Sequence, residues 1–141
     1  MFVIDANVLL YAVNSASVLH PAARGWLDRA LAGSESVGFV WSVMLAFVRL
    51  ATHPSVFPRP LSPEEALRIV RLWLASPVAV TVVPTDRHLA ILEDLLKASG
   101  SGGNLVSDAH LAALAIEHDA TLVSHDADFG RFDGLVWERP R

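Results

Sequence analysis

The sequence predicts an α/β fold in which helices cover both faces of a central parallel sheet. Short apolar runs of strand length alternate along the chain with longer segments whose apolar residues recur at helical spacing. Such alternation is typical of right-handed crossover connections that place a helix between successive parallel strands. With 141 residues, 52% of them hydrophobic, the chain is expected to form a single domain, residues 1–141, around one core.

The beginning of the chain predicts one strand and two helices. Phe2 to Ile4 is a short apolar run, which indicates a buried strand whose carboxyl end presents Asp5. Val8 to Val13 is expected to be helical. Between His20 and Ala32 the apolar positions repeat at helical spacing with charged residues between them, and the serines of residues 34–36 end this second helix.

The next segments continue the alternation. Val37 to Val40 predicts a second strand, and Ser42 is expected to cap a helix that runs to about Thr52, before a proline-rich loop. Ser62 to Glu65 then combines an N-cap serine, a proline at the first helical position and a capping-box glutamate. A helix is therefore expected from there to about Leu74.

The following region leads into the longest buried helix. Val78 to Val83 predicts a third strand, Asp86 to Ala98 a helix, and Ser99 to Gly103 a flexible loop. Asn104 is a candidate N-cap for the next helix. Residues 105–116 are apolar on nearly every helical face, which predicts a helix that is buried on most sides and ends near His118.

Acidic residues surround the end of that region. Asp108 lies in the first turns of the buried helix, where a carboxylate is costly unless a partner or a metal satisfies it. Thr121 to Ser124 predicts a short strand that delivers Asp126 and Asp128 at its carboxyl end. Residues 135–137 are expected to add a last strand.

Three of these carboxylates are expected to meet at one edge of the sheet. If the first strand is central and the 121–124 strand lies beside it, Asp5 and Asp126 emerge as neighbours, and the helix carrying Asp108 starts at the same edge. Close carboxylates repel one another unless a cation lies between them, and oxygen ligands suit Mg2+ or Mn2+. The pattern predicts metal-assisted phosphodiester hydrolysis, with Asn7 and Ser124 able to hold a carboxylate or a water.

The order of these motifs resembles a PIN domain, and more narrowly a VapC-type toxin ribonuclease of a type II toxin-antitoxin system. The likeness covers essentially the whole chain, and its motifs are D-A-N, W-S-V-M-L-A-F-V-R-L-A-T, N-L-V-S-D-A-H-L-A-A-L-A, L-V-S-H-D-A-D-F and G-L-V-W-E. The resemblance implies a three-layer α/β/α fold with strand order 3-2-1-4-5 and a Mg2+-dependent endoribonuclease acting on RNA. It also implies a homodimer, neutralised by a cognate VapB-type antitoxin whose tail enters the active site.

The resemblance also assigns the site residues, with one departure. It supports Asp5, Asp108 and Asp126 as the core acidic positions and leaves Asp128 as an accessory candidate. PIN domains usually carry a glutamate in the helix after the second strand, where this chain has Ala46. The alternative is therefore a catalytically weak or inactive PIN fold that binds RNA or an antitoxin without cutting.

The composition of the chain argues against several other classes of protein. The net charge of −4 argues against a general nucleic-acid coat protein, and the absence of cysteine excludes disulfides and thiolate metal sites. The longest apolar run is too short to span a bilayer and the N-terminus lacks a basic segment, so we expect no membrane association and a cytoplasmic protein. A receiver domain would need an acidic pair near the first strand and a lysine late in the chain, whereas Lys97 is the only lysine. A phosphatase with an aspartate nucleophile would need a second aspartate at the position of Asn7.

Each site residue also has an ordinary structural explanation. Asp5 could be a turn residue, Asp108 a partner of the helix dipole and Asp126 a helix cap. The histidines of the central region are interpreted as structural or surface residues: His110, His118 and His125. Four arginines are candidates for RNA phosphate contacts: Arg49, Arg68, Arg71 and Arg87.

Overall fold

Five short parallel strands form the central sheet of the computed structural model, which describes residues 1–100 and 105–141. In chain order the strands are β1 (Phe2–Ile4), β2 (Val37–Phe39), β3 (Ala79–Thr81), β4 (Thr121–Val123) and β5 (Trp137–Glu138). Their order across the sheet is β3-β2-β1-β4-β5, which confirms the expected 3-2-1-4-5 arrangement. Because β1 is central and Ile4 pairs with Val123, the carboxyl ends of β1 and β4 lie side by side.

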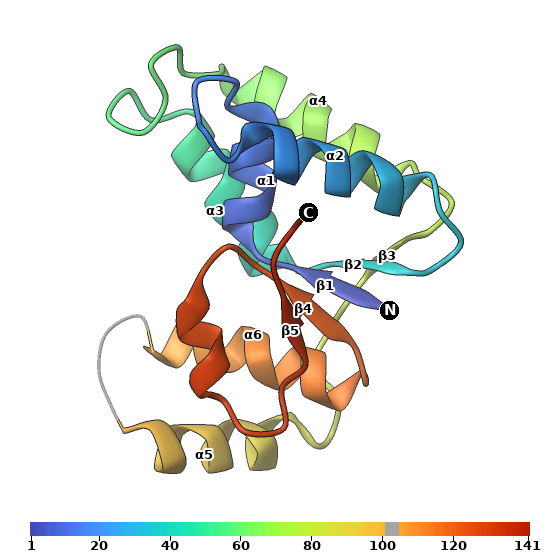
Figure 1. The fold of residues 1–141 in the computed structure, drawn as a ribbon, viewed down its shortest axis with the longest axis vertical. Coiled ribbons are helices and arrows are strands. Elements are labelled where there is room, and N and C mark those ends of the chain that lie inside the picture. The colour runs from blue at the N-terminus through green and yellow to red at the C-terminus, as the bar shows by residue number, and fades with distance from the viewer. Residues whose placement is uncertain (101–104) are drawn as a thin grey trace.

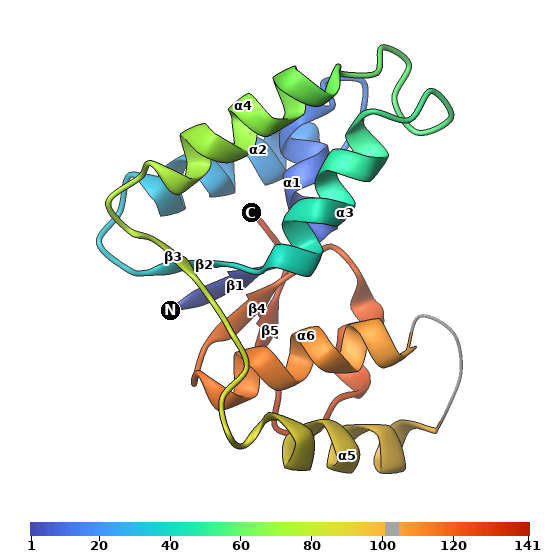
Figure 2. The same cartoon turned by 180° about the vertical axis from the view of Figure 1, so that it is seen from behind.

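Helices cover the sheet on both faces (Figures 1 and 2). One side carries α1 (Ala6–Val13), α2 (His20–Leu31), α3 (Trp41–Ala51) and α4 (Pro63–Leu74). The other side carries α5 (His88–Ser99), α6 (Leu105–Glu117) and the short 3-10 helix η1 (Ala127–Arg131). Within the described residues, no helix is long and apolar enough to cross a bilayer.

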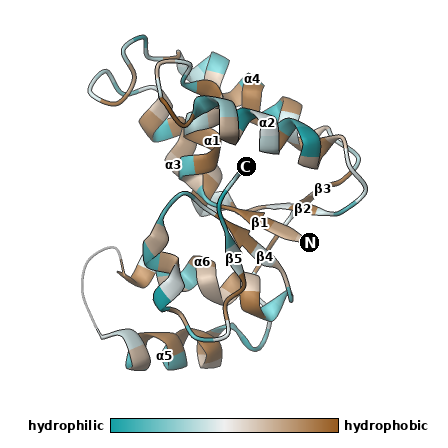
Figure 3. Ribbon diagram, in the orientation of Figure 1, coloured by the Kyte–Doolittle hydropathy of each residue, from teal (hydrophilic) through white to brown (hydrophobic). Residues whose placement is uncertain are grey.

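The two central strands form the middle of the core. Val3 and Ile4 of β1 and Leu122 and Val123 of β4 are fully buried, and both strands are apolar in Figure 3, whereas α2 displays hydrophilic residues. Gly38 of β2 is required by close packing, since a Cβ there would lie 2.5 Å from the Val82 side chain. The sheet therefore gives the residues at its carboxyl edge a rigid support.

Several helix starts follow the sequence signals and others do not. Ser62 caps α4 as expected, because its Oγ accepts a hydrogen bond from the Glu65 amide at 3.1 Å. The expected cap at Ser42 is wrong: Val40 holds the N-cap position of α3 without a side-chain bond, because β2 runs almost directly into the helix. The helix expected from Asp86 begins two residues later, as α5.

The predicted strands occur where they are expected, but they are shorter in the structure than predicted. The segment 78–83 contributes only β3, an edge strand whose last two residues are exposed, so fewer positions pair with a neighbour. The last strand is shifted, since β5 comprises two residues rather than residues 135–137. The predicted cap at Asn104 and most of the predicted loop 99–103 lie outside the described residues.

Candidate active site

Two adjacent strands deliver the first part of the site. Asp5 follows β1, and its amide donates to the carbonyl of Val123 at 3.0 Å, which ties it to β4. Ser124 follows β4 and is fully buried. The parallel pairing of β1 with β4 thus brings together residues that are 119 positions apart in the sequence.

Hydrogen bonds fix the Asp5 carboxylate. Its Oδ1 accepts from the Ala6 amide at 2.7 Å, and its Oδ2 accepts from Ser124 Oγ at 2.7 Å and from Asn7 Nδ2 at 2.9 Å. Asn7 is itself held, because its Oδ1 accepts from the His125 amide at 3.0 Å. Asn7 and Ser124 therefore orient the Asp5 carboxylate, and their accessory role in the site stays a prediction.

Asp126 and Asp108 approach from two further elements. The Asp126 amide donates to Ser124 Oγ at 3.0 Å, and its Oδ1 accepts from the Asp128 amide at 2.9 Å, which caps η1. Asp108 lies in the first turns of α6, where its Oδ2 accepts from Arg131 Nη2 at 3.2 Å. The predicted capping duty of Asp126 is thus real, and it leaves the second carboxylate oxygen free of that bond.

The three predicted carboxylates line one pocket of about 410 Å3. It is lined by residues from the junction between β1 and α1, from α3 and α6, and from the segment after β4: Asp5, Ala6, Ser42, Val43, Ala46, Arg49, Ser107, Asp108, Leu111 and Asp126. The accessory candidate Asp128 is not among them; its contact with the site is the amide bond to Asp126.

One face of α3 forms part of the pocket wall. Ser42, Ala46 and Arg49 are spaced by four and three residues, so they lie on the same side of the helix. Ala46, the position at which the resemblance implies a glutamate, therefore lines the pocket. The role of Ser42 in the wall is not anticipated by the sequence, whose local pattern assigns this residue to a helix cap.

The electrostatics of the pocket favour a cation. Burial raises the pKa of Asp5, partly offset by the bonds from Ser124 and Ala6, and the charge of Asp126 raises it further. The pKa of Asp108 is also raised, chiefly by burial and then by the charges of Asp5 and Asp126, while Arg131 lowers it. The carboxylates thus disfavour one another's ionised form, which a bound cation would relieve.

The carboxylate oxygens of the pocket are suitable ligands for a hard divalent ion, although the three carboxylates do not surround a single metal position. In the chain as described, no group of three or more His, Cys, Asp or Glu side chains lies close enough to hold one metal. Mg2+ usually binds through one or two carboxylates and keeps several waters, so a closed three-carboxylate cage is not needed. The residues therefore fit Mg2+ or Mn2+, provided that Arg131 or water adjusts around Asp108.

A buried polar network at the other end of α6 was missed by sequence reasoning. His88 Nδ1 lies 2.8 Å from Glu117 Oε2, and His88 Nε2 lies 2.9 Å from His110 Nδ1. His118 Nε2 lies 2.7 Å from the Val83 carbonyl oxygen. The structural interpretation of His110 and His118 agrees with these contacts, but no sequence signal distinguished Glu117 from an exposed helix-end residue.

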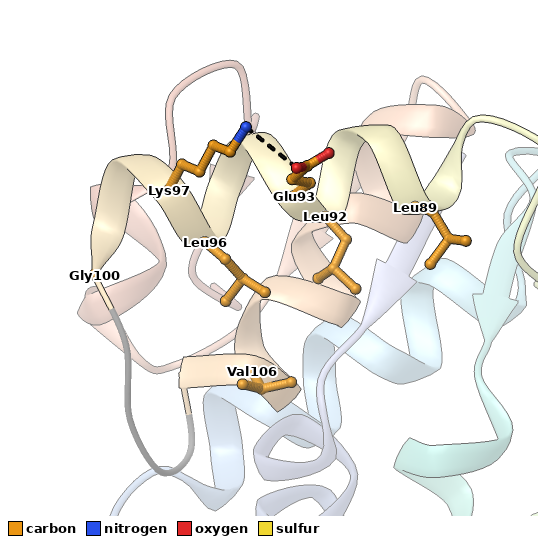
Figure 4. A pocket seen from close by; sticks show the side chains of 7 residues that line it. All are labelled: Leu89, Leu92, Glu93, Leu96, Lys97, Gly100 and Val106. Atoms are coloured by element: carbon orange, nitrogen blue, oxygen red, sulfur yellow. Dashed lines mark ion pairs between the residues drawn. The ribbon is translucent and has the colours of Figure 1, made fainter.

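A larger cavity elsewhere lacks the groups needed for chemistry. It has a volume of about 610 Å3, lies over α5 and the start of α6, and is lined mainly by Leu89, Leu92, Leu96 and Val106 (Figure 4). Its two charged residues, Glu93 and Lys97, pair with each other at 3.2 Å. The smaller acidic pocket is therefore the candidate active site.

Comparison with known proteins shows which family shares this fold. A family model described as "PIN domain" matches residues 2–135, and the chain belongs to this family. Within it, the chain is 57% identical over 140 residues to Ribonuclease VapC37 of Mycobacterium tuberculosis (strain ATCC 25618 / H37Rv), covering 99% of this chain and 97% of that protein. It is 39% identical over 140 residues to Ribonuclease VapC43 of the same strain, covering 99% and 95%.

Solved structures share the fold at low sequence identity. The VapBC2 structure from Rickettsia felis, bound to a DNA fragment from its promoter, matches with a TM-score of 0.72 and 18% identity, covering 99% of this chain and 98% of that chain. Mycobacterium tuberculosis VapC20, a Sarcin-Ricin loop cleaving toxin, matches with a TM-score of 0.66 and 17% identity, covering 96% and 99%. These matches agree with the sheet order and the layers described above.

Proposed function

We propose that the protein is a metal-dependent endoribonuclease of the VapC type, with Mg2+, or alternatively Mn2+, bound in the pocket that Asp5, Asp108 and Asp126 line, by one or two of these carboxylates directly and by the others through water. The observation that carries the proposal is that these three carboxylates line one pocket in a chain 57% identical to a ribonuclease. Oxygen ligands at a rigid sheet edge suit ions that act on phosphate groups.

The chain's own residues position the reaction. A bound divalent ion supplies a water of lowered pKa and stabilises charge on the phosphate oxygens. Asn7 and Ser124 hold Asp5 in one orientation, and the η1 cap fixes Asp126. Hydrolysis forms a bond from the water oxygen to phosphorus and breaks the bond to the leaving nucleoside oxygen, which takes up a proton.

The proposed partners are a VapB-type antitoxin and a second copy of the chain. Structures that share the fold include VapBC complexes, such as VapBC-1 from nontypeable Haemophilus influenzae. A homodimer is what the resemblance to VapC toxins implies, and the exposed apolar side chains of Leu89 and Val106 are compatible with association. Copurification with the product of an adjacent short gene, and sedimentation at micromolar concentration, test both partners.

A PIN fold that binds without cutting remains the second candidate, because Ala46 lines the pocket in place of a fourth carboxylate. Cleavage of a panel of structured RNAs, with and without Mg2+, decides between the two. We expect cleavage that requires the ion. Intact RNA across the panel in both Mg2+ and Mn2+ would favour the binding protein.

The site assignment is tested by Asp126→Asn in the same assay. Asparagine keeps an oxygen for the Asp128 amide, so the cap and the fold should persist while a metal ligand is lost. We expect cleavage to fall at least about 100-fold, the upper end of the effect seen for outer-shell partners of metal ligands. Asp133→Asn, an exposed position outside the pocket, is the matched control. Undiminished cleavage by Asp126→Asn would refute the assignment.

A further inference from the structure

Two arginines bring positive charge to the acidic pocket, and their surroundings differ. Arg131 is engaged, since its Nη2 contacts Asp108 Oδ2 at 3.2 Å and its guanidinium lies over the Phe132 ring. Arg49 lines the pocket from α3. Throughout residues 1–100 and 105–141, its side chain forms no ion pair and donates no hydrogen bond.

The sequence of α3 explains why no acidic side chain of its own helix pairs with Arg49. Ala46 lies three residues earlier on the same helical face, where an acidic side chain would pair with an arginine. Ser42, the next pocket residue along this face, is uncharged. The α3 wall therefore contributes one unneutralised guanidinium to a pocket that the three carboxylates also line.

A free guanidinium beside a cation site is favourable only when an anion lies between them. The metal and the arginine repel each other, whereas a phosphate group attracts both. A guanidinium also matches the geometry of phosphate oxygens, because it donates two parallel N–H bonds. The pocket thus has a carboxylate side suited to a divalent ion and an arginine side suited to the phosphate that the ion acts on.

We propose that Arg49 is a substrate-binding residue that contacts the non-bridging oxygens of an RNA phosphate in this pocket. The assignment rests on the proposed ribonuclease function and deepens it by naming the residue that holds the phosphate. It also separates Arg49 from the other arginines on exposed helix faces, because Arg68 and Arg71 of α4 do not line the acidic pocket.

The test measures binding apart from cleavage. Asp126→Asn serves as a non-cleaving background in which Arg49→Gln, Arg49→Lys and the control Arg59→Gln are compared; Arg59 is exposed and lies outside the acidic pocket. Affinity for a fluorescent RNA that the wild type cleaves is followed by anisotropy over a range of salt concentrations. Thermal melts establish that each variant is folded.

We expect Arg49→Gln to weaken binding about tenfold or more, as for the loss of a hydrogen bond to a charged group. The slope of log affinity against log salt should fall in magnitude by about 0.7, the value for one phosphate contact on a single strand. Arg49→Lys should retain the slope and lose part of the affinity, since it keeps the charge without the bidentate geometry. With Asp126 intact, Arg49→Gln should raise KM for RNA while Arg59→Gln does not.

The failure of this inference is distinguishable from the failure of the proposed function. If the wild type cleaves RNA but Arg49→Gln matches Arg59→Gln in affinity and salt slope, Arg49 does not bind the phosphate. If Arg49→Gln only tightens Mn2+ binding in calorimetry and leaves RNA binding unchanged, the arginine acts on the metal alone and the inference is wrong. A wild type that neither cleaves nor binds RNA would overturn the proposed function itself.

Discussion

Each end of α6 carries a carboxylate, and the two carboxylates differ in burial and in hydrogen bonding. Near its start, Asp108 is 26% exposed, and among residues 1–100 and 105–141 its carboxylate has one ion-pair partner, Arg131 at 3.2 Å. At its end, the Glu117 side chain is fully buried, with Oε1 accepting from the Thr85 amide at 2.9 Å and Oε2 lying 2.8 Å from His88 Nδ1. The more deeply buried carboxylate is therefore the better satisfied one.

The difference distinguishes a carboxylate that stabilises helix packing from one that we propose to bind a metal. Around Glu117, hydrogen bonds continue through His88 to His110 and join α5 to α6, so they stabilise the packing of the two helices. Around Asp108, the neighbouring charges of Asp5 and Asp126 are repulsive and raise its pKa. A cluster that destabilises itself in the absence of a cation indicates a binding site, whereas burial alone does not.

The largest effect on stability is expected from Glu117→Ala. The substitution leaves the Thr85 amide and the His88 ring without their buried partner, which should cost about 3 kcal/mol of the free energy of unfolding. Urea denaturation measures the loss, and the control Glu93→Ala, which removes only an exposed pair with Lys97, should change stability by less than about 1 kcal/mol. Equal losses in the two variants would contradict the contrast between the ends of α6.

A smaller effect, on metal affinity, is expected from Ala46→Glu. A fourth carboxylate in the pocket should tighten Mg2+ binding about tenfold and lower the stability of the metal-free protein, because it adds a like charge. The wild type should correspondingly need Mg2+ in roughly the millimolar range. Titration calorimetry compares this variant with Leu45→Glu, which alters the exposed neighbouring position on α3.

Equal Mg2+ affinities for wild type and Ala46→Glu would contradict the idea that the pocket lacks a ligand, unless the introduced glutamate pairs with another residue. Pairing of the introduced glutamate with Arg49 would produce the same result, since the two positions are three apart on one helix. The double variant Ala46→Glu with Arg49→Gln separates these explanations, because it removes the competing cation.

The smallest effect is a dependence of stability on pH in the absence of metal. The folded-state pKa values of Asp5 and Asp108 lie above the ordinary value of 3.8, so the folded protein binds more protons than the unfolded chain just above that pH. The free energy of unfolding should therefore decrease as pH rises from 3.8 through the raised pKa values.

Thermal melts in EDTA across this pH range test the expectation, with Asp108→Asn as the comparison. The melting temperature of Asp108→Asn, relative to that of the wild type, should increase as pH rises. Mg2+ should reduce this difference because it stabilises the ionised carboxylates of the wild type. A difference that does not change with pH would mean that Asp108 is not strained by its neighbours. Asp133→Asn, exposed and outside the pocket, provides the baseline.

The sequence by itself determined the architecture and the acidic edge. Alternating strand and helix signals require parallel pairing, and parallel strands end at the same edge, so Asp5 and Asp126 could be placed at one edge of the sheet, as neighbours if their strands are adjacent. Asp108 followed from its place at the start of a buried helix. The resemblance to PIN domains added the strand order and marked Ala46 as a departure before its position on the pocket wall was known.

Only the tertiary structure decided which side chains meet. Periodicity reports which face of a helix is apolar, but the partner of a polar residue depends on which distant element packs against it. The pair of Asp108 with Arg131, the burial of Glu117 against His88 and the place of Arg49 on the pocket wall all join separate elements. Such contacts depend on ångström-scale packing between segments far apart in the chain, and local sequence patterns do not encode it.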